Sequence, residues 1–264
     1  MTRAVAVLLT ALLAQAACTS TTTTTSRSDD SFTPAPSAVE DKARERARVH
    51  TELASGYYEL GNMAVALEEV REALRAQSGY GPAYNVAGLI YAELKEDKLA
   101  QENFQQALRI DPLDSDANNN YGRFLCDRQR TDDAIRYFMA ALRNPLYKTP
   151  ERSYVNAGLC LRRRGDFAGA EDYFNKALKL QSGQPQALYQ LADMAYSRRA
   201  YPQAKQYITR LERVSPANAE VLWLAFRVER KLGDRDAAAS YSTQLTRNFP
   251  QSKEAAALQA GIEE

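Results

Sequence analysis

The pattern of apolar and polar residues between positions 81 and 112 predicts two short amphipathic helices joined by a polar turn at residues 95–98. A small residue, Gly88, lies where the two helices would have to approach closely, and the ring of Phe104 would fill the space beside that crossing. Pro112 would end the second helix, because proline cannot continue it. One such helix pair cannot bury its own apolar face, so neighbouring pairs are expected.

The same order of small, aromatic and proline positions recurs along the chain in both directions. Six windows align, and they begin near residues 47, 81, 115, 151, 185 and 219, which are 34, 34, 36, 34 and 34 residues apart. The period and the residue types resemble the tetratricopeptide (TPR) repeat. The resemblance implies an all-α fold, a right-handed superhelical solenoid of about six repeats, with a capping helix within residues 252–264. The alternative is an irregular helical bundle, which would need no common register.

The N-terminus has a different composition and predicts a signal peptide over residues 1–17. Arg3 precedes an apolar run at residues 4–14, and this length is typical of a secretory signal rather than of a membrane-spanning helix. After this run no apolar stretch is long enough to cross a bilayer as a helix.

Two cleavage patterns fit the end of the predicted signal peptide. Residues 14–16 read Ala-Gln-Ala and fit ordinary signal cleavage, whereas residues 15–18 resemble a bacterial lipobox, in which Cys18 becomes a lipidated N-terminus. We favour lipidation of Cys18, because residues 18–38 are polar, include five consecutive threonines and are typical of a disordered tether. The repeat array is then predicted to occupy residues 39–264.

Composition and charge point away from nucleic-acid binding and from catalysis. The 34 basic and 33 acidic residues nearly balance, so no basic excess indicates a nucleic-acid partner. His50 is the only histidine, and the chain has no metal-ligand spacing, no phosphate-binding loop and no cofactor motif. We therefore predict a protein that is not an enzyme, binds no metal or cofactor, and has no small-molecule substrate.

Two of the three cysteines fall one repeat apart. Cys126 and Cys160 are 34 residues apart and lie in the first helices of consecutive repeats. In a TPR array such helices pack side by side, so a disulfide between the two residues is geometrically possible, and we predict one. The alternative is two independent buried thiols.

The TPR resemblance also implies which side chains point into the concave groove of the array. First helices line this groove, and their inward positions carry aromatic, arginine and asparagine side chains that suit the binding of a polypeptide segment. Each of these residues could instead only pack between neighbouring helices. The predicted partner-binding residues are Tyr58, Asn85, Leu89, Asn119, Arg123, Arg162, Tyr189 and Trp223.

Three stretches within the array contain residues that the TPR consensus does not require. They read NNNYGRFLC at residues 118–126, NPLYKTPE at residues 144–151 and NAGLC at residues 156–160. Together with the signal peptide, Cys18 and the tether, they resemble the PilF/PilW-type pilotins, the lipoproteins of type IV pilus biogenesis. Thr19 after the cysteine resembles the pattern of lipoproteins that are sorted to the outer membrane.

The second resemblance implies a function, a location and a partner. It implies a lipoprotein anchored through Cys18 to the periplasmic face of the outer membrane, which binds the pilus secretin and promotes its localisation and multimerisation. Pilus assembly and twitching motility would depend on it. One alternative is a general periplasmic TPR scaffold for outer-membrane protein assembly or cell-wall synthesis. Another is a cytoplasmic TPR module that regulates an enzyme and keeps residues 1–18.

Overall fold

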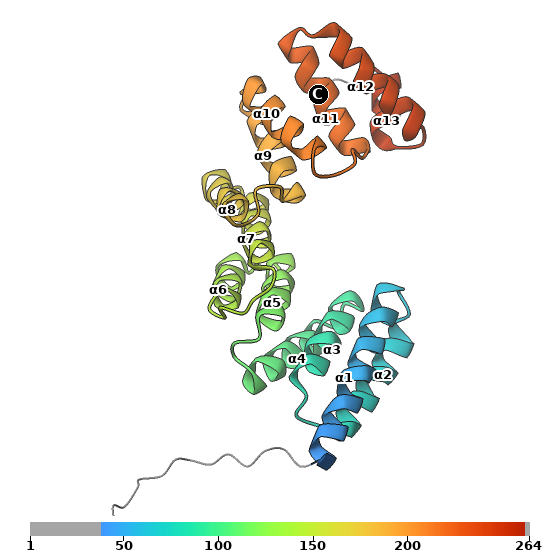
Figure 1. The fold of residues 1–264 in the computed structure, drawn as a ribbon, viewed down its shortest axis with the longest axis vertical. Coiled ribbons are helices and arrows are strands. Elements are labelled where there is room, and N and C mark those ends of the chain that lie inside the picture. The colour runs from blue at the N-terminus through green and yellow to red at the C-terminus, as the bar shows by residue number, and fades with distance from the viewer. Residues whose placement is uncertain (1–37, 262–264) are drawn as a thin grey trace, which may run out of the picture. The chain divides into compact units, whose positions relative to one another are not determined.

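The computed structural model describes residues 38–261, and these residues fold into helices connected by short turns (Figure 1). The described residues contain thirteen helices, and no strand is found among them. The helices are α1 (Ala38–Glu59), α2 (Met63–Ala76), α3 (Gly81–Glu93), α4 (Asp97–Ile110), α5 (Ser115–Asp127), α6 (Thr131–Ala141), α7 (Pro150–Arg164), α8 (Phe167–Leu180), α9 (Pro185–Ser197), α10 (Tyr201–Glu212), α11 (Ala219–Leu232), α12 (Arg235–Asn248) and α13 (Lys253–Gln259).

The observed helices follow the repeat register expected from the sequence. The first helices of the second to sixth repeats begin at residues 81, 115, 150, 185 and 219, beside predicted starts of 81, 115, 151, 185 and 219. The first repeat differs, because α1 begins at Ala38 rather than near residue 47. The predicted signal peptide, the lipidation site Cys18 and nearly all of the tether lie outside the described residues, as do residues 262–264.

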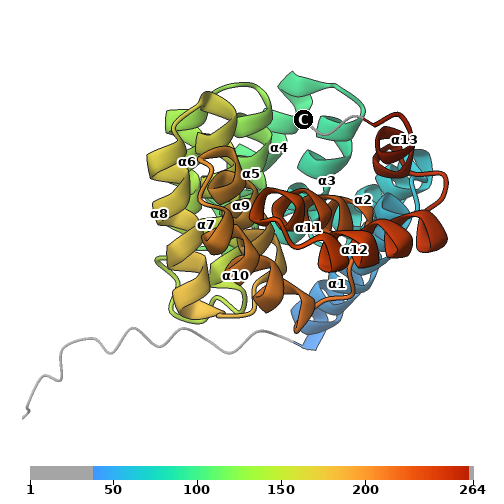
Figure 2. The same ribbon diagram turned by 90° about the horizontal axis from the view of Figure 1, so that it is seen from above.

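Each repeat is an antiparallel pair of helices, and successive pairs stack in chain order (Figure 2). The first helix of a pair packs on the second, and the first helices α1, α3, α5 and α7 also contact one another in sequence. The all-α TPR solenoid predicted from the sequence is therefore confirmed. Its core consists of apolar clusters that continue from one repeat to the next, because each pair covers the face that its neighbour leaves open.

Within the central repeats, a glycine on the first helix lies directly beneath a phenylalanine ring on the second. A Cβ atom at Gly122 would lie 2.7 Å from the ring of Phe138, and one at Gly158 would lie 2.6 Å from the ring of Phe174. Gly88 and Phe104 repeat this arrangement at 2.7 Å. Real Cβ contacts are not this short, so these helix pairs can approach as closely as they do only because the side chain is absent.

The turn inside every repeat uses one left-handed residue at the same position. The backbone N–H that follows this residue donates to the carbonyl five residues earlier, which is the longer bond of a Schellman helix cap. The left-handed residues have φ between 61° and 86°, and they are Gly61, Lys95, Gln129, Gly165, Arg199 and Gly233. Their spacing of 34, 34, 36, 34 and 34 residues shows that all six repeats share one turn geometry.

The two additional residues of the third repeat lie in its connection to the fourth. Helix α6 ends at Ala141 and α7 begins at Pro150, and Asn144 organises the segment between them. Its Oδ1 accepts a hydrogen bond from the backbone N–H of Leu146 at 2.9 Å, and its Nδ2 donates to the carbonyl of Leu113 at 3.3 Å. The NPLY stretch that stood out in the sequence therefore ties this longer loop to the preceding repeat.

Among residues 38–261, a helix covers the C-terminal end of the array, whereas part of the α1 face stays exposed. Helix α13 packs on α11 and α12, where Ala255 joins Leu222 and Leu245 in a cluster closed to solvent, so the predicted capping helix is confirmed. Leu53 on α1 keeps 45% of its surface exposed, and Leu60, which directly follows α1, keeps 74%. None of the helices in residues 38–261 is long and apolar enough to span a membrane.

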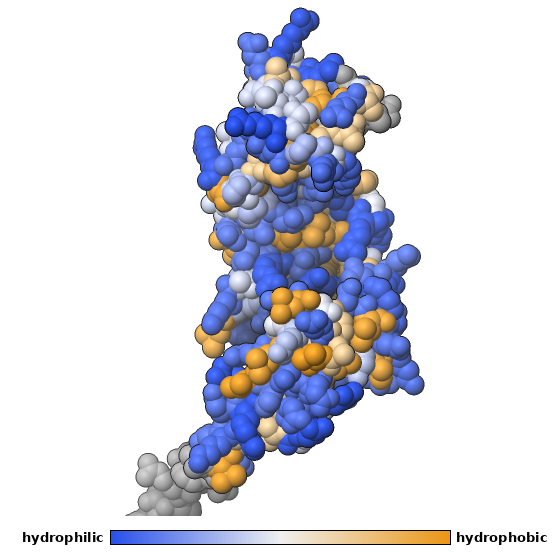
Figure 3. Space-filling view, turned by 90° about the vertical axis from the view of Figure 1, so that its right-hand side faces the viewer, coloured by the Kyte–Doolittle hydropathy of each residue, from blue (hydrophilic) through white to orange (hydrophobic). Residues whose placement is uncertain are grey.

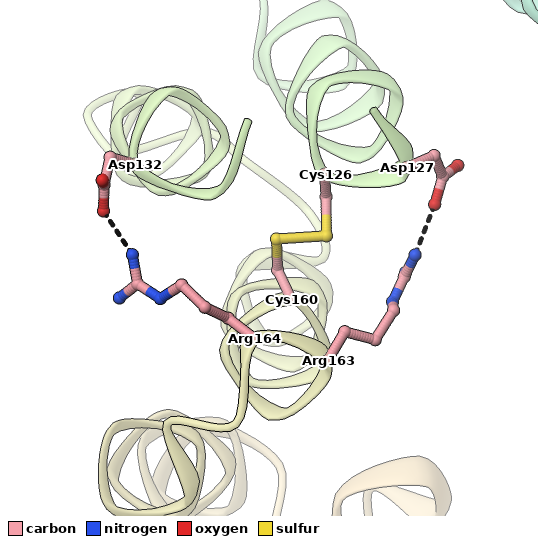
Figure 4. Close-up of a disulfide and its surroundings, with 6 residues drawn as sticks. All are labelled: Cys126, Asp127, Asp132, Cys160, Arg163 and Arg164. Carbon is pink, nitrogen blue, oxygen red and sulfur yellow. Dashed lines mark hydrogen bonds and ion pairs between the residues drawn. A yellow bond between two sulfur atoms is a disulfide. The ribbon is translucent and has the colours of Figure 1, made fainter. Parts of the chain in front are cut away.

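Cys126 at the end of α5 and Cys160 on α7 face each other across the junction of the third and fourth repeats, and their sulfur atoms are joined (Figure 4). Their Cα atoms are 5.7 Å apart, within the range that a disulfide can span. Two ion pairs flank the bridge: Arg163 contacts Asp127, and Arg164 contacts Asp132, each at 2.6 Å. The arrangement agrees with the pairing predicted from the sequence.

Alanine should destabilise the protein at Gly122 and stabilise it at Gly56, because only Gly122 lies against a phenylalanine ring. Gly122→Ala should lower the free energy of unfolding by about 1–3 kcal/mol, because the added methyl group forces the ring to move. Gly56→Ala is the control: Gly56 lies in α1 with no atom within 4 Å of the added carbon, so alanine should stabilise by up to about 1 kcal/mol. Urea denaturation of both variants measures this. A Gly122→Ala variant as stable as the parent would contradict the close crossing.

The bridge between α5 and α7 predicts a redox-dependent stability. Closing a loop over a sequence separation of 34 residues removes unfolded-state entropy worth about 3–4 kcal/mol in the chain-entropy model. The oxidised protein should therefore melt at a higher temperature than the reduced protein, and Cys126 and Cys160 should resist alkylation until reductant is added. A Cys126→Ser, Cys160→Ser variant should melt at the same temperature with and without reductant. Two freely alkylated thiols in the folded oxidised protein would refute the bridge.

Candidate functional site: the concave face of the repeat array

The candidate site is the face formed by the first helices of the repeats, α1, α3, α5, α7, α9 and α11. Repeat arrays of this kind present an extended concave surface that binds partners. In the space-filling view, apolar side chains appear on the molecule as separate patches on an otherwise hydrophilic surface (Figure 3). The chemistry of the face therefore depends on which individual side chains stay accessible after the repeats have packed.

Three of the predicted partner-binding residues line one small pocket. Tyr58 of α1, Leu89 of α3 and Arg123 of α5 meet around a cavity of about 80 Å³ that spans the first three repeats. The rings of Phe104 and Phe124 contribute to its lining and are themselves closed to solvent. The pocket therefore combines an aromatic lining with a charged rim that carries both basic residues and the acidic residues Glu93 and Asp127.

Among the described residues on the rim of this pocket, Arg128 is held by internal polar contacts, whereas Tyr58 and Arg123 are not. The guanidinium of Arg128 lies 4.6 Å from the centre of the Phe124 ring and donates a hydrogen bond to Asp97 of the preceding repeat, which lowers the pKa of that carboxyl group. Within residues 38–261, neither Tyr58 nor Arg123 makes a side-chain hydrogen bond or ion pair, and Arg123 is exposed. These two side chains are available to a partner without breaking an internal contact.

The two asparagines predicted to bind a partner, Asn85 and Asn119, form hydrogen bonds between neighbouring repeats. The Oδ1 atom of Asn85 accepts a hydrogen bond from Asn120 Nδ2 at 3.2 Å. Asn119 is 1% exposed, and its Oδ1 accepts from Asn156 Nδ2 at 2.9 Å and from Ser153 Oγ at 3.2 Å. The structure does not leave Asn119 accessible to a partner, so the role predicted for it is wrong.

Asn120 and Asn156 are the residues that the sequence reasoning missed. Both precede the crossing glycine of their repeat by two positions, and each donates to the asparagine one position earlier in the register of the preceding repeat. The same hydrogen bond therefore joins the second repeat to the third and the third to the fourth. The signal in the sequence was an asparagine at a fixed offset before glycine in consecutive repeats.

The predicted residues of the later repeats are also engaged in packing. Arg162 of α7 contacts Asp193 and Gln190 of α9, which ties the fourth repeat to the fifth. Tyr189 is half-buried, and burial, with the nearby charge of Asp193, raises its pKa to about 12, so its hydroxyl stays protonated at neutral pH. Trp223 packs against the cluster beneath α13 and stacks on Phe226, with ring centres 5.4 Å apart.

The only histidine has a structural partner. His50 Nδ1 lies 2.6 Å from Glu69 Oε2, and this contact joins α1 to α2. Within the described part of the chain, no group of three or more histidine, cysteine, aspartate or glutamate side chains is placed to hold a metal ion.

Comparison with known proteins agrees with the repeat architecture. The tetratricopeptide repeat family profiles match residues 81–112 and 114–183. Over 221 residues the chain is 34% identical to the type IV pilus assembly protein PilF of Pseudomonas aeruginosa, and the alignment covers 83% of this chain and 88% of that protein.

Two solved structures share this fold along most of their length. The structure of Pseudomonas aeruginosa PilF superimposes with a TM-score of 0.72 at 33% identity, over 84% of this chain and 99% of that one. PilW, described as a widely conserved type IV pilus biogenesis factor, superimposes with a TM-score of 0.70 at 34% identity, over 81% and 98%. The chain therefore belongs to the family of TPR proteins of type IV pilus biogenesis that includes PilF and PilW.

Proposed function

We propose that this protein binds the secretin of the type IV pilus through its concave face and promotes the assembly of the secretin into its multimeric ring. Membership of the PilF/PilW family supports a role in pilus biogenesis. A secretin must be brought to the outer membrane and multimerised, and a rigid groove with exposed binding groups suits this task better than any catalytic arrangement. Pilus formation and twitching motility would then depend on the protein.

The pocket between α1, α3 and α5 is the observation that carries the proposal. It joins an aromatic lining to Arg123 and Tyr58, and neither side chain has an internal polar partner among the described residues. Aromatic and arginine side chains contribute most often to binding hot spots, because they combine a large buried area with directional hydrogen bonds. Leu89 adds apolar contact beside them. We assign this pocket the main contact with the secretin.

We further propose that the protein is held at the periplasmic face of the outer membrane by lipid on Cys18. The apolar run before this cysteine and the polar, threonine-rich segment after it support this assignment. A tether over residues 18–38 would let the folded array reach a secretin while the anchor stays in the bilayer. One acyl chain binds a membrane only marginally, so a stable anchor needs more than one chain.

Substitutions in the pocket test the proposed contact. A Tyr58→Ala, Arg123→Ala variant should bind secretin about thirtyfold more weakly, which corresponds to about 2 kcal/mol for a lost hot spot. It should fold normally, because Arg123 is exposed and Tyr58 is only a partly buried neighbour of the apolar cluster around Ala54 and Val70. The measurements are circular dichroism, secretin binding in envelope extracts, and the amount of secretin recovered as multimers.

The matched control is Arg136→Ala, which removes an arginine from α6, a second helix of its repeat, where 77% of the side chain is exposed. This variant should assemble secretin at the parent level. If the pocket variant also does so, the pocket is not the secretin site. If instead the pocket variant leaves twitching intact but damages the cell envelope in general, the protein acts as a general periplasmic scaffold.

Cys18→Ser tests the membrane anchor. The variant should appear in the soluble periplasmic fraction or remain unprocessed, because the lipid attachment site is lost, whereas the parent protein should fractionate with the outer membrane. Mass spectrometry of the parent should find lipid on an N-terminal Cys18. A mature protein that begins before Cys18 and carries no lipid mass would overturn this part of the proposal.

A further inference from the structure

A second pocket on the concave face lies at the C-terminal ends of α9 and α11 and is strongly cationic. Its volume is about 90 Å³, and its lining consists of Tyr196, Phe226, Arg227, Arg230 and Lys231. Three of these five residues carry a positive charge and none carries a negative one. Pockets for small-molecule ligands usually enclose about 300–1,000 Å³, so this one is the size of a single side-chain head group.

Arg227 is held rigidly in this pocket and is not neutralised. Its guanidinium carbon lies 4.2 Å from the centre of the Tyr196 ring and 5.9 Å from that of Trp223, so aromatic faces fix the orientation of the planar group. Its Nε atom is closed to solvent and has no hydrogen-bond partner among the described residues. Within those residues Arg227 forms no ion pair. A buried donor without an acceptor is costly, and a bound ligand with an acceptor oxygen would remove that cost.

Two acidic side chains that the structure describes on α9 and α11 are paired outside this pocket. Asp193 of α9 contacts Arg162, and Glu229 of α11 accepts from Lys205 at 2.9 Å. Arg230 lies 5.7 Å above the Phe226 ring, and Lys231 stands beside it on the rim of the pocket. Among the described residues, Arg227 and Lys231 therefore keep a positive charge at this pocket, although the whole chain has a formal net charge of only +1.

We propose that this pocket binds the carboxylate of an acidic side chain in a polypeptide that lies along the later repeats. The carboxylate accepts from the edge of the Arg227 guanidinium, which can donate in a forked geometry, while Lys231 adds charge. An apolar side chain next to the acid packs on the rings of Phe226 and Trp223. The inference does not depend on the identity of the partner bound at the first pocket, and it adds a specificity for charge to the C-terminal half of the groove.

The single tryptophan of the chain is a built-in reporter for this site. Because Trp223 stands beside Arg227, a ligand that enters the pocket should change its fluorescence. The probe is a terminally blocked peptide in which two glutamates alternate with leucines, and its partner is the same peptide with glutamines in place of the glutamates. The glutamate peptide should give a saturable change and bind at least about tenfold more tightly than the glutamine peptide.

Two variants of the full-length protein complete the test, with anisotropy of a labelled glutamate peptide as the second readout. Arg227→Gln should weaken binding at least about tenfold, whereas Arg235→Gln, which removes the same charge from the exposed start of α12, should not change it. Equal binding of the two peptides, no saturable binding of either, or unchanged binding by Arg227→Gln would each overturn the proposal. None of these results bears on secretin assembly, so the two proposals can fail separately.

Discussion

The close crossing of two helices over a glycine is the constraint on which the rest of this structure depends. At Gly88, Gly122 and Gly158 the missing side chain makes room for a phenylalanine ring, and this sets the distance between the two helices of the repeat. The same space is divided differently where the ring is absent: Ala54 packs in one cluster with Val70, and Ala192 packs in one cluster with Ile208. In these two repeats alanine replaces the glycine, and a smaller aliphatic side chain replaces the ring.

The shape of the concave face depends on how neighbouring helix pairs pack against each other. The hydrogen bonds from Asn120 to Asn85 and from Asn156 to Asn119 lock the first helices of the second, third and fourth repeats side by side. Buried polar groups that are fully satisfied make such a junction specific, because a shifted helix would leave them unpaired. The groove is therefore presented by a stiff central segment. One pocket, with an aromatic lining and a charged rim, lies where the first repeat meets this segment, and a second pocket, with a cationic lining, lies beyond it on α9 and α11.

The architecture could be predicted from the sequence because six aligned repeats carry the same pattern of small, aromatic and proline residues. The helix starts of the second to sixth repeats follow from a register that no single window could establish, whereas the start of α1 does not. The prediction was weaker for side-chain roles on the groove, since an inward-pointing asparagine looks the same whether it binds a partner or a neighbouring helix. Asn119 illustrates this, because only the structure shows that Ser153 and Asn156 use its oxygen. Tyr58, Leu89 and Arg123 line one pocket, and their role in partner binding stays a prediction.

The link between Cys126 and Cys160 has a mechanical consequence for the repeat array. A repeat array pulled from its two ends extends by peeling off one helix pair after another, because each pair contacts only its neighbours. The bridge spans 34 residues and carries the tension directly from α5 to α7, so the chain between the two cysteines cannot be drawn out. About 110–120 Å of contour length stays hidden from a pulling force. The centre of the array thus bears load as one piece while its ends can yield.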